Sequence, residues 1–340
     1  MPLCLPSHVD CGEPGVILNG NVTFLSFSKK QYLSVIEYHC NEPYYTFPGQ
    51  KKVTFTCASD GKWKDSNNND ILPLCVPVCG RPTVTTSVHR RIIGGQWAAP
   101  GSIPWQVFLT VQYGRGGAAV IGSRWILTAA HGLNAVLPEH VRMIMSFQIY
   151  VGHNNILKML ESPPFQVESL HVHPLYNNPK DRNFNHDIAL IKLKQHITFN
   201  TNIMPLCLPS RDHQLVSGFG MTETKFPTNL KFVRVPLVKD DVCRKSIEKL
   251  TNETSEDFKF TENMFCAGFP EGGRDSCSGD GGGAFALENN NQFWAAGIVS
   301  WGVDCGEAGK YGVYTRVAQY SGWINDIMEG KCKINNFELQ

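Results

Sequence analysis

The sequence has almost no net charge, although it is 340 residues long. Lys and Arg number 31 against 30 Asp and Glu, and charged residues make up 18% of the chain. This balance gives no electrostatic attraction toward nucleic acid or an anionic membrane surface, so we predict neither as a partner. The short basic pairs are interpreted as solvated surface. They are Lys29-Lys30, Lys51-Lys52 and Arg90-Arg91.

Long hydrophobic runs and a secretory leader are also missing. No stretch approaches the roughly 18–20 apolar residues of a membrane-spanning helix. The start, Met1-Pro2-Leu3-Cys4, has neither the basic residues nor the apolar run of a signal peptide. We therefore expect this chain to be a fragment of a longer protein.

No Cys-x-x-Cys pair occurs among the 12 cysteines, which argues against a zinc ribbon. Cysteines spread along the whole chain instead indicate disulfides and an oxidising compartment. Asn21 and Asn252 each begin a glycosylation sequon, Asn-Val-Thr and Asn-Glu-Thr. These features predict a secreted, extracellular glycoprotein that needs no cofactor and no metal.

His171 and His173 are the one pair that suggests a metal site, because alternate residues share a strand face. No third ligand lies in register with them. We therefore prefer a structural role for both histidines.

Residues 10–76 contain short β-rich runs broken by Gly, Pro and Asn, between Cys11, Cys40, Cys57 and Cys75. Trp63 follows the third of these cysteines. This pattern resembles a sushi (complement control protein) module, which implies the disulfides Cys11–Cys57 and Cys40–Cys75. The alternative is another disulfide-stapled β module. Residues 1–9, with Cys4, resemble the end of a preceding module.

Residues 77–91 are polar and aperiodic, as expected of an exposed activation linker. From residue 92 the chain shows short apolar runs separated by turn residues, and one late helix with an apolar face, Val317–Met328. The pattern predicts an all-β barrel or sandwich spanning residues 92–332, followed by a tail at 333–340. The clearest strands are expected at Trp105–Val111, Val120–Leu127, Phe165–Val172, Ile188–Leu193 and Ala295–Ser300.

Four motifs follow one another in this second region. They are Thr-Ala-Ala-His ending at His131, His-Asp-Ile-Ala-Leu containing Asp187, Cys-Ser-Gly-Asp-Gly-Gly-Gly at 277–283, and Ser300-Trp301-Gly302. Nucleophilic catalysis requires a base that accepts a proton and a carboxylate that orients this base. The joint pattern resembles the trypsin-like serine proteases. It implies two packed six-stranded β-barrels with a C-terminal helix, His131 as base and Asp187 as its orienting group.

Gly281 stands where that family has its nucleophilic serine. The base and its partner are therefore present, while the attacking hydroxyl is missing. Ser276 and Ser278 are the nearest hydroxyls, but in the family both border the substrate pocket and lie away from the base, so neither is expected to substitute.

The resemblance implies that recognition groups remain around Gly281. The backbone N–H groups of Gly279 and Gly281 would form the oxyanion hole, which requires no side chain. Asp275 would lie at the base of the specificity pocket and pair with Arg or Lys of a substrate. The alternative for Asp275 is a surface loop position. The other substrate-binding positions are Ser276, Ser300, Trp301, Gly302 and Gly312.

The family also activates by proteolysis. Cleavage after Arg91 would free the amine of Ile92, which inserts beside Asp280 and orders the pocket. The implied disulfides are Cys79–Cys207, Cys243–Cys266 and Cys277–Cys305, while Cys332 has no assigned partner. Gly132 replaces the cysteine that usually follows the base. With this absence and the preceding sushi module, the chain most resembles the complement proteases of the r-subcomponent type, followed by the s-subcomponent and lectin-associated types.

Three hypotheses follow. The chain is a complement-type endopeptidase specific for Arg or Lys and impaired by Gly281, or a pseudoprotease that binds substrates or inhibitors without cutting them, or a surface for assembly. The third is disfavoured, because an assembly surface has no need for His131, Asp187, Asp275, Asp280 and the Arg91-Ile92 site together. The expected partners are a protein substrate or a protease inhibitor, and other complement proteases.

Overall fold

The structure is a computed structural model of the chain. The residues that it describes are 9–26, 29–84, 95–111, 114–134, 147–177, 184–209, 215–218, 227–254, 256–276 and 279–331. The chain divides into two compact units, Met1–Val78 and Cys79–Gln340. Within the described residues, no helix combines the length and the apolar character that a membrane span requires.

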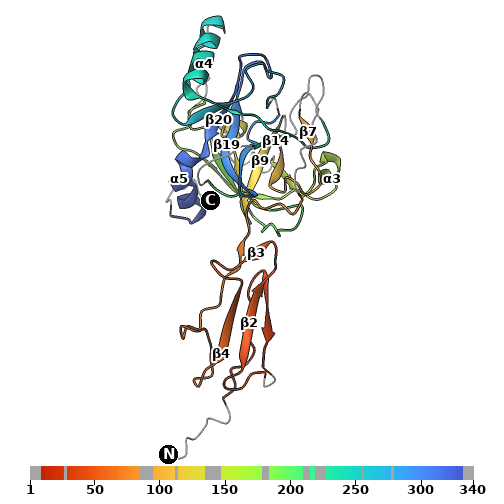
Figure 1. Cartoon of the computed structure of the whole chain (residues 1–340), viewed down its shortest axis with the longest axis vertical. Helices are drawn as coiled ribbons and strands as arrows, with labels where there is room; N and C mark the ends of the chain where they lie inside the picture. The colour runs from red at the N-terminus through yellow and green to blue at the C-terminus, as the bar shows by residue number, and fades with distance from the viewer. Residues whose placement is uncertain are drawn as a thin grey trace, which may run out of the picture. The chain divides into compact units, whose positions relative to one another are not determined.

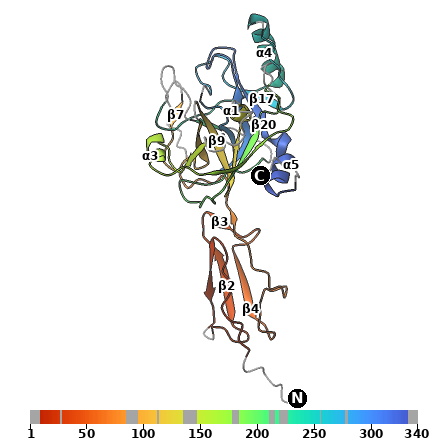
Figure 2. The ribbon, with the colours of Figure 1, turned by 180° about the vertical axis from the view of Figure 1, so that it is seen from behind.

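The described part of the first unit is built from short strands. They are β1 (Gly20–Phe24), β2 (Val35–Cys40), β3 (Tyr45–Thr46), β4 (Lys52–Cys57), β5 (Trp63–Lys64) and β6 (Val76–Pro77). Four of them form a sheet in the order β1-β2-β4-β5, in which β2 and β4 lie side by side (Figures 1 and 2). The strands β3 and β6 pair separately.

Two disulfides and a buried tryptophan hold this first unit together. Cys11 is bonded to Cys57 and Cys40 to Cys75, the pairs that the sushi resemblance implied. Trp63 is 9% exposed and donates its Nε1–H to a backbone carbonyl at 3.2 Å. Because so small a unit buries little apolar surface, such crosslinks matter, and each contributes about 2–4 kcal/mol to stability.

The first sheet of the second unit has six antiparallel strands, in the order β11-β8-β9-β10-β13-β12. They are β8 (Gln106–Val111), β9 (Gly114–Gly122), β10 (Trp125–Thr128), β11 (Gln148–Val151), β12 (Val167–Val172) and β13 (Ala189–Leu193). The two ends of the sheet meet where Phe165 donates its N–H to the carbonyl of Ile149 at 2.9 Å. The run Val120–Leu127, expected as one strand, is two, because the chain turns at Ser123-Arg124.

The second sheet has the order β16-β17-β20-β19-β18-β14-β15-β7. Its strands are β7 (Gln96–Trp97), β14 (Leu215–Gly218), β15 (Lys231–Val233), β16 (Leu237–Val238), β17 (Met264–Ala267), β18 (Ala284–Asn289), β19 (Gln292–Trp301) and β20 (Gly312–Arg316). This sheet has more than the six expected strands because the two-residue strands β16 and β7 extend its edges. The main core of the unit includes Trp105, Leu190, Ile298, Val317 and Ile324, each at most 1% exposed.

The C-terminal helix expected from the sequence is present, and the described part of the second unit also contains helices that were not expected. The described helices of the second unit are α1 (His131–Asn134), α3 (Ile156–Leu160), α4 (Asp240–Thr254) and α5 (Ser321–Met328). The expected helix Val317–Met328 begins with a 3-10 turn, Val317–Tyr320, before α5. In both views α4 extends outward from the sheets (Figures 1 and 2). Its buried residues, Cys243, Ile247 and Leu250, are spaced by four and three, as an amphipathic helix requires.

Candidate active site

His131 and Asp187 come together because the strands beside them are paired. β10 ends at Thr128, which lies opposite Ala189 of β13. His131 begins α1 just after β10, and Asp187 lies just before β13. The Asp187 carboxylate accepts hydrogen bonds from the backbone N–H and from Nδ1 of His131, each at 2.8 Å. These contacts fix the orientation of the imidazole ring and turn Nε2 away from the carboxylate.

Asp187 is completely buried, and its oxygen atoms accept hydrogen bonds from neighbouring groups. Its side chain is 0% exposed. The Ser300 hydroxyl donates to its Oδ2 at 2.5 Å, and the Thr315 hydroxyl donates to its backbone carbonyl at 2.8 Å. A buried charged group requires such partners, because it has lost its hydration. Asp187 is therefore held in one position from two strands, β19 and β20.

The buried carboxylate also changes the basicity of His131. Burial by itself disfavours the charged imidazolium. The negative charge of Asp187 and its hydrogen bond to Nδ1 outweigh this effect, so the pKa of His131 is raised above its usual 6.5. His131 thus accepts a proton at Nε2 more readily than an isolated histidine.

Gly281 faces Nε2 of this ring. An ideal Cβ built on Gly281 would stand 2.8 Å from Nε2 and 3.2 Å from Cε1 of His131. A side chain at this position would therefore point at the basic nitrogen, as a nucleophilic hydroxyl must. Since 2.8 Å is closer than a Cβ tolerates, the ring occupies part of the space that a side chain would need. Among the described residues, Nε2 has no hydrogen-bond partner.

The loop around Gly281 is fixed by its backbone. The carbonyl of Gly281 accepts the N–H of Gly117 in β9 at 2.9 Å, and the N–H of Gly282 donates to Val299 of β19 at 2.8 Å. The N–H groups of Gly279 and Gly281, expected in the oxyanion hole, donate to no acceptor within the described residues.

Asp275 lies beside the two glycines that were expected to wall the specificity pocket. A Cβ on Gly312 would stand 2.7 Å from Oδ1 of Asp275, and one on Gly302 would stand 3.9 Å from Cα of Gly312. Larger residues would therefore fill this space. The Asp275 carboxylate accepts the N–H of Ser276 at 2.8 Å and of Gly306 at 3.3 Å.

Asp275 is more basic than an exposed aspartate. Burial is the largest cause, and the negative charge of Asp280 adds to it, while the two backbone hydrogen bonds act in the opposite direction. Together they raise the pKa of Asp275 to about 6. An unpaired carboxylate in such surroundings is stabilised by a cationic ligand.

The other predicted substrate-binding residues have defined contacts. The Ser276 hydroxyl lies 3.0 Å from the buried Tyr314 hydroxyl. Trp301 stacks with Phe258 and with Phe184, with ring centroids 5.3 Å and 6.0 Å away. The ring of Phe184 in turn meets the His131 ring edge-on at 6.0 Å. Trp301 is thus connected to the base through Phe184, whereas Ser300 supports Asp187 directly.

The structure includes neighbours of the candidate site that the motifs did not indicate. Tyr314, Phe184, Phe258 and Thr315 all contact predicted site residues. These contacts join distant segments, so no local pattern announces them. Ser278, an alternative nucleophile, lies outside the described residues, and Ser276 is engaged with Tyr314.

The two histidines considered as a metal pair have other neighbours. His171 Nε2 lies 2.8 Å from the Ser169 hydroxyl, and His173 stacks on His186 with ring centroids 5.0 Å apart. The described residues include no cluster of three or more His, Cys, Asp or Glu that could hold a metal ion.

The remaining expected residues are placed as follows. Cys79 is bonded to Cys207 and Cys243 to Cys266, as the resemblance implied. Cys305 is disulfide-bonded, but its expected partner Cys277 lies outside the described residues. Cys4, Arg91, Ile92 and Cys332 also lie outside them. Asp280 is half-buried, and the sequon residues Asn21 in β1 and Asn252 in α4 are both exposed.

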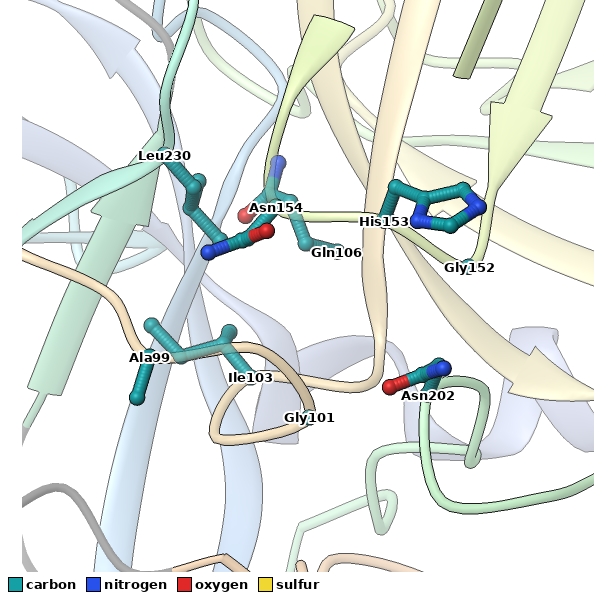
Figure 3. Close-up of a pocket in the computed structure, with 9 residues that line it drawn as sticks. All are labelled: Ala99, Gly101, Ile103, Gln106, Gly152, His153, Asn154, Asn202 and Leu230. Atoms are coloured by element: carbon teal, nitrogen blue, oxygen red, sulfur yellow. The ribbon is translucent and has the colours of Figure 1, made fainter. Parts of the chain in front are cut away.

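A separate shallow hollow lies away from these groups (Figure 3). It is lined by Ala99, Gly101, Ile103, Gln106, Gly152, His153, Asn154, Asn202 and Leu230. Asn154 is anchored there, because its side-chain amide donates to the carbonyl of Ala98 at 2.8 Å. None of the predicted site residues lines this hollow.

Comparison with known proteins matches both units. The family model described as Trypsin covers residues 92–324, well over half of the chain. This chain belongs to the trypsin family. The model described as Sushi repeat (SCR repeat) covers residues 11–75. The chain is therefore a sushi module with a trypsin-family domain, and the fold class expected from the sequence is confirmed.

Several complement proteins are similar to this trypsin-family chain. Complement C1r-A subcomponent of Mus musculus is 38% identical over 96% of this chain and 48% of its own length. Complement C1s-1 subcomponent of Mus musculus is 37% identical over the same shares. Complement C1r subcomponent-like protein of Homo sapiens is 36% identical over 87% of this chain and 61% of its own length. The chain thus spans about half to three fifths of the relatives it matches, and it is a complement-type member of the family.

Proposed function

We propose that this chain is a complement-type protease unit that recognises Arg or Lys and is impaired in cutting the peptide bond. The proposal depends on one observation: the direction from Gly281 toward Nε2 of His131, along which a side chain would stand 2.8 Å from the base. The proposed base faces position 281, whereas Gly281 itself supplies no hydroxyl.

The roles of the other groups follow from their chemistry. His131 Nε2 is the proton acceptor, and Asp187 stabilises the imidazolium that forms. The N–H groups of Gly279 and Gly281 face a carbonyl oxygen on which negative charge develops. Asp275 pairs with the cationic side chain of the substrate. Without a nucleophilic hydroxyl, turnover falls on the order of a million-fold, as in other triads that lose the serine.

The test restores the missing hydroxyl. Gly281→Ser is expected to hydrolyse arginyl esters after cleavage at Arg91, whereas the chain with Gly281 hydrolyses them negligibly. Gly281→Ala is the matched control, because it adds the same Cβ near Nε2 without a hydroxyl and should stay inactive. Substantial hydrolysis by the unchanged chain that is blocked by a serine-directed reagent would refute the assigned triad.

The second candidate is a pseudoprotease that holds substrates or inhibitors without cutting them. It is favoured by the closeness of the His131 ring to position 281, which leaves too little room for a Cβ without movement of the ring. The Gly281→Ser variant distinguishes the impaired protease from the pseudoprotease. If it is folded, cleaved at Arg91 and binds an aromatic amidine such as benzamidine, yet stays inactive, the site is specialised for binding.

The biological setting is proposed from the relatives. C1r and C1s are named as complement subcomponents, so other complement proteases are the expected partners. We further propose secretion, glycosylation at Asn21 and Asn252, and activation by a cut between Arg91 and Ile92, with Asp280 as the acceptor of the new amine. The exposed positions of both sequon asparagines support modification.

A further inference from the structure

Residues 304–310 form part of the connection between β19 and β20, and this loop reaches the carboxylate of Asp275. The contact is made by Gly306, whose N–H donates to Oδ2 of Asp275 at 3.3 Å. On its other side, the carbonyl of Gly306 accepts the N–H of Gly273 at 2.7 Å. The bond from Gly306 is longer than the 2.8 Å bond from Ser276 to the same carboxylate, so a small movement of the loop would break it.

Lys310 joins the two sides of this loop. Its Nζ pairs with the carboxylate of Asp304 and lies 2.8 Å from Oε2 of Glu307. Asp304 precedes Gly306 and Glu307 follows it, so the two ion pairs close the loop around Gly306. A single exposed ion pair contributes little, whereas an ammonium shared by two carboxylates forms a network that restrains both. The Lys310 side chain is 21% exposed, which limits its alternative positions.

The backbone of the loop depends on this restraint. Asp304 has a φ of +52°, in the left-handed region that residues with a Cβ rarely adopt. The backbone hydrogen bonds inside the loop are long: Glu307 donates to Asp304, and Lys310 to Glu307, each at 3.2 Å. Without the ammonium, the carboxylates of Asp304 and Glu307 would repel each other across Gly306. We therefore expect the loop to open when Lys310 loses its charge.

We propose that Lys310 is a positioning residue for Asp275, which holds the Gly306 N–H against this carboxylate by joining Asp304 and Glu307. The inference rests on the proposed function, because it concerns the carboxylate that would pair with Arg or Lys of a substrate. Lys310 acts through the loop and needs no contact with the substrate.

The position of the loop affects the protonation of Asp275. The hydrogen bond from Gly306 favours the ionised carboxylate and lowers its pKa. Of the other influences, burial and the charge of Asp280 raise this pKa, and the N–H of Ser276 lowers it. The nearby Tyr314 hydroxyl stays neutral, because burial raises its pKa. Loss of the bond from Gly306 therefore moves the pKa of Asp275 upward, and the pH at which a cation ceases to bind rises with it.

The experiment measures the pH midpoint of benzamidine binding to the full chain cut after Arg91, by calorimetry between pH 5 and pH 9. Lys310→Met removes the charge and should raise the midpoint by about half a unit to one unit, as one long hydrogen bond to a charged group allows. At pH 6 this is an affinity loss of about two- to fivefold. General damage to the site would instead lower the affinity at every pH and leave the midpoint in place. Lys310→Arg keeps both ion pairs and should keep the midpoint.

A second variant distinguishes an effect through the loop from an effect of the Lys310 charge across space. Asp304→Asn combined with Glu307→Gln keeps Lys310 and removes its two partners, and asparagine tolerates the left-handed backbone at position 304. An effect through the loop predicts a higher midpoint, as in Lys310→Met. A direct effect of charge predicts the opposite, because the removal of two negative charges lowers the pKa of a carboxyl. Both acids are more than half exposed, so their replacement should leave the chain folded.

The outcomes are distinct. A midpoint that stays unchanged or falls, in Lys310→Met or in the double variant, overturns this inference. The proposed function still stands in that case, provided that benzamidine binds the unchanged chain. Failure of benzamidine to bind the folded, cut chain, or binding that persists in Asp275→Asn, refutes the proposed recognition of Arg and Lys, and the role of Lys310 with it.

Discussion

At the scale of single residues, the proposed recognition of a cation by Asp275 should depend on pH. Its pKa is raised to about 6, chiefly by burial, so the carboxyl is half protonated near that pH in the free site. A cationic ligand binds only the ionised form. The affinity for benzamidine, which stays positively charged, should therefore be constant above pH 7 and fall by about tenfold per unit well below pH 6. Fluorescence or calorimetric titration between pH 8 and pH 5 measures this dependence.

Two variants distinguish the effect of Asp275 on benzamidine binding from the effect of His131. Asp275→Asn should abolish benzamidine binding at every pH. His131 also gains charge as the pH falls, and its cation would repel benzamidine. If protonation of Asp275 is the cause, the His131→Ala variant should still lose affinity for benzamidine below pH 6. A pH-independent affinity in His131→Ala would assign the effect to the histidine and contradict this prediction.

The motifs predicted which residues are needed in the site, but not how each one is supported. His131 and Asp187 were recognised because each lies in a characteristic short motif, and the structure places them 2.8 Å apart. Ser300 was expected only at the substrate, yet its hydroxyl also binds the buried Asp187. The neighbours Tyr314 and Phe184 could not be predicted, because their contacts join segments distant in the sequence and depend on the packing of both sheets.

At the scale of elements, β9 and the loop that carries Gly281 pack backbone against backbone. A Cβ on Gly282 would stand 2.3 Å from Oγ1 of Thr128 and 2.5 Å from the carbonyl of Gly117, and Gly282 has a φ of +84°. Both the contact and the left-handed backbone exclude a side chain. Gly282→Ala should therefore lower the free energy of unfolding by about 2 kcal/mol or more and weaken benzamidine binding.

The matched control for this change is Gly322 in α5. A Cβ there meets nothing within 4 Å, and its backbone lies outside the left-handed region. Gly322→Ala should leave stability unchanged or raise it by up to about 1 kcal/mol, because alanine favours a helix. Urea denaturation of both variants makes the comparison. Equal stability of the two would show that the loop can move away from β9 at little cost.

Strands with a clear run of apolar residues were predicted well, whereas a helix with few apolar residues was not. The expected strands at Trp105–Val111 and Phe165–Val172 agree with β8 and β12 to within two residues at each end. In contrast, α4 was missed, because its polar sequence carries only three buried residues, one of them a disulfide-bonded cysteine. Its helical face is defined by the sheet on which it packs, and this partner is invisible in the local sequence.

At the scale of the whole molecule, the proposed cleavage site after Arg91 lies, in the sequence, between two cysteines that a disulfide joins. Cys79 is bonded to Cys207, so a cut after Arg91 leaves both products covalently joined. On the proposed function, in which position 281 supplies no nucleophilic hydroxyl, this cut must come from another protease. Purified protein incubated alone should therefore remain uncut, as judged by gel electrophoresis under reducing conditions.

A limiting amount of trypsin can make the cut after Arg91 in place of the other protease. It should give fragments 1–91 and 92–340 that separate only after reduction, and sequencing of the second fragment should begin at Ile92. Arg91→Gln is the control for the position of the cut, and Cys79→Ser should release the fragments without reduction. A cut at Arg91 that arises in the purified chain, and disappears in His131→Ala, would mean that the site cleaves peptide bonds without a serine at 281. The assignment of Gly281 as the cause of impaired cleavage would then be wrong.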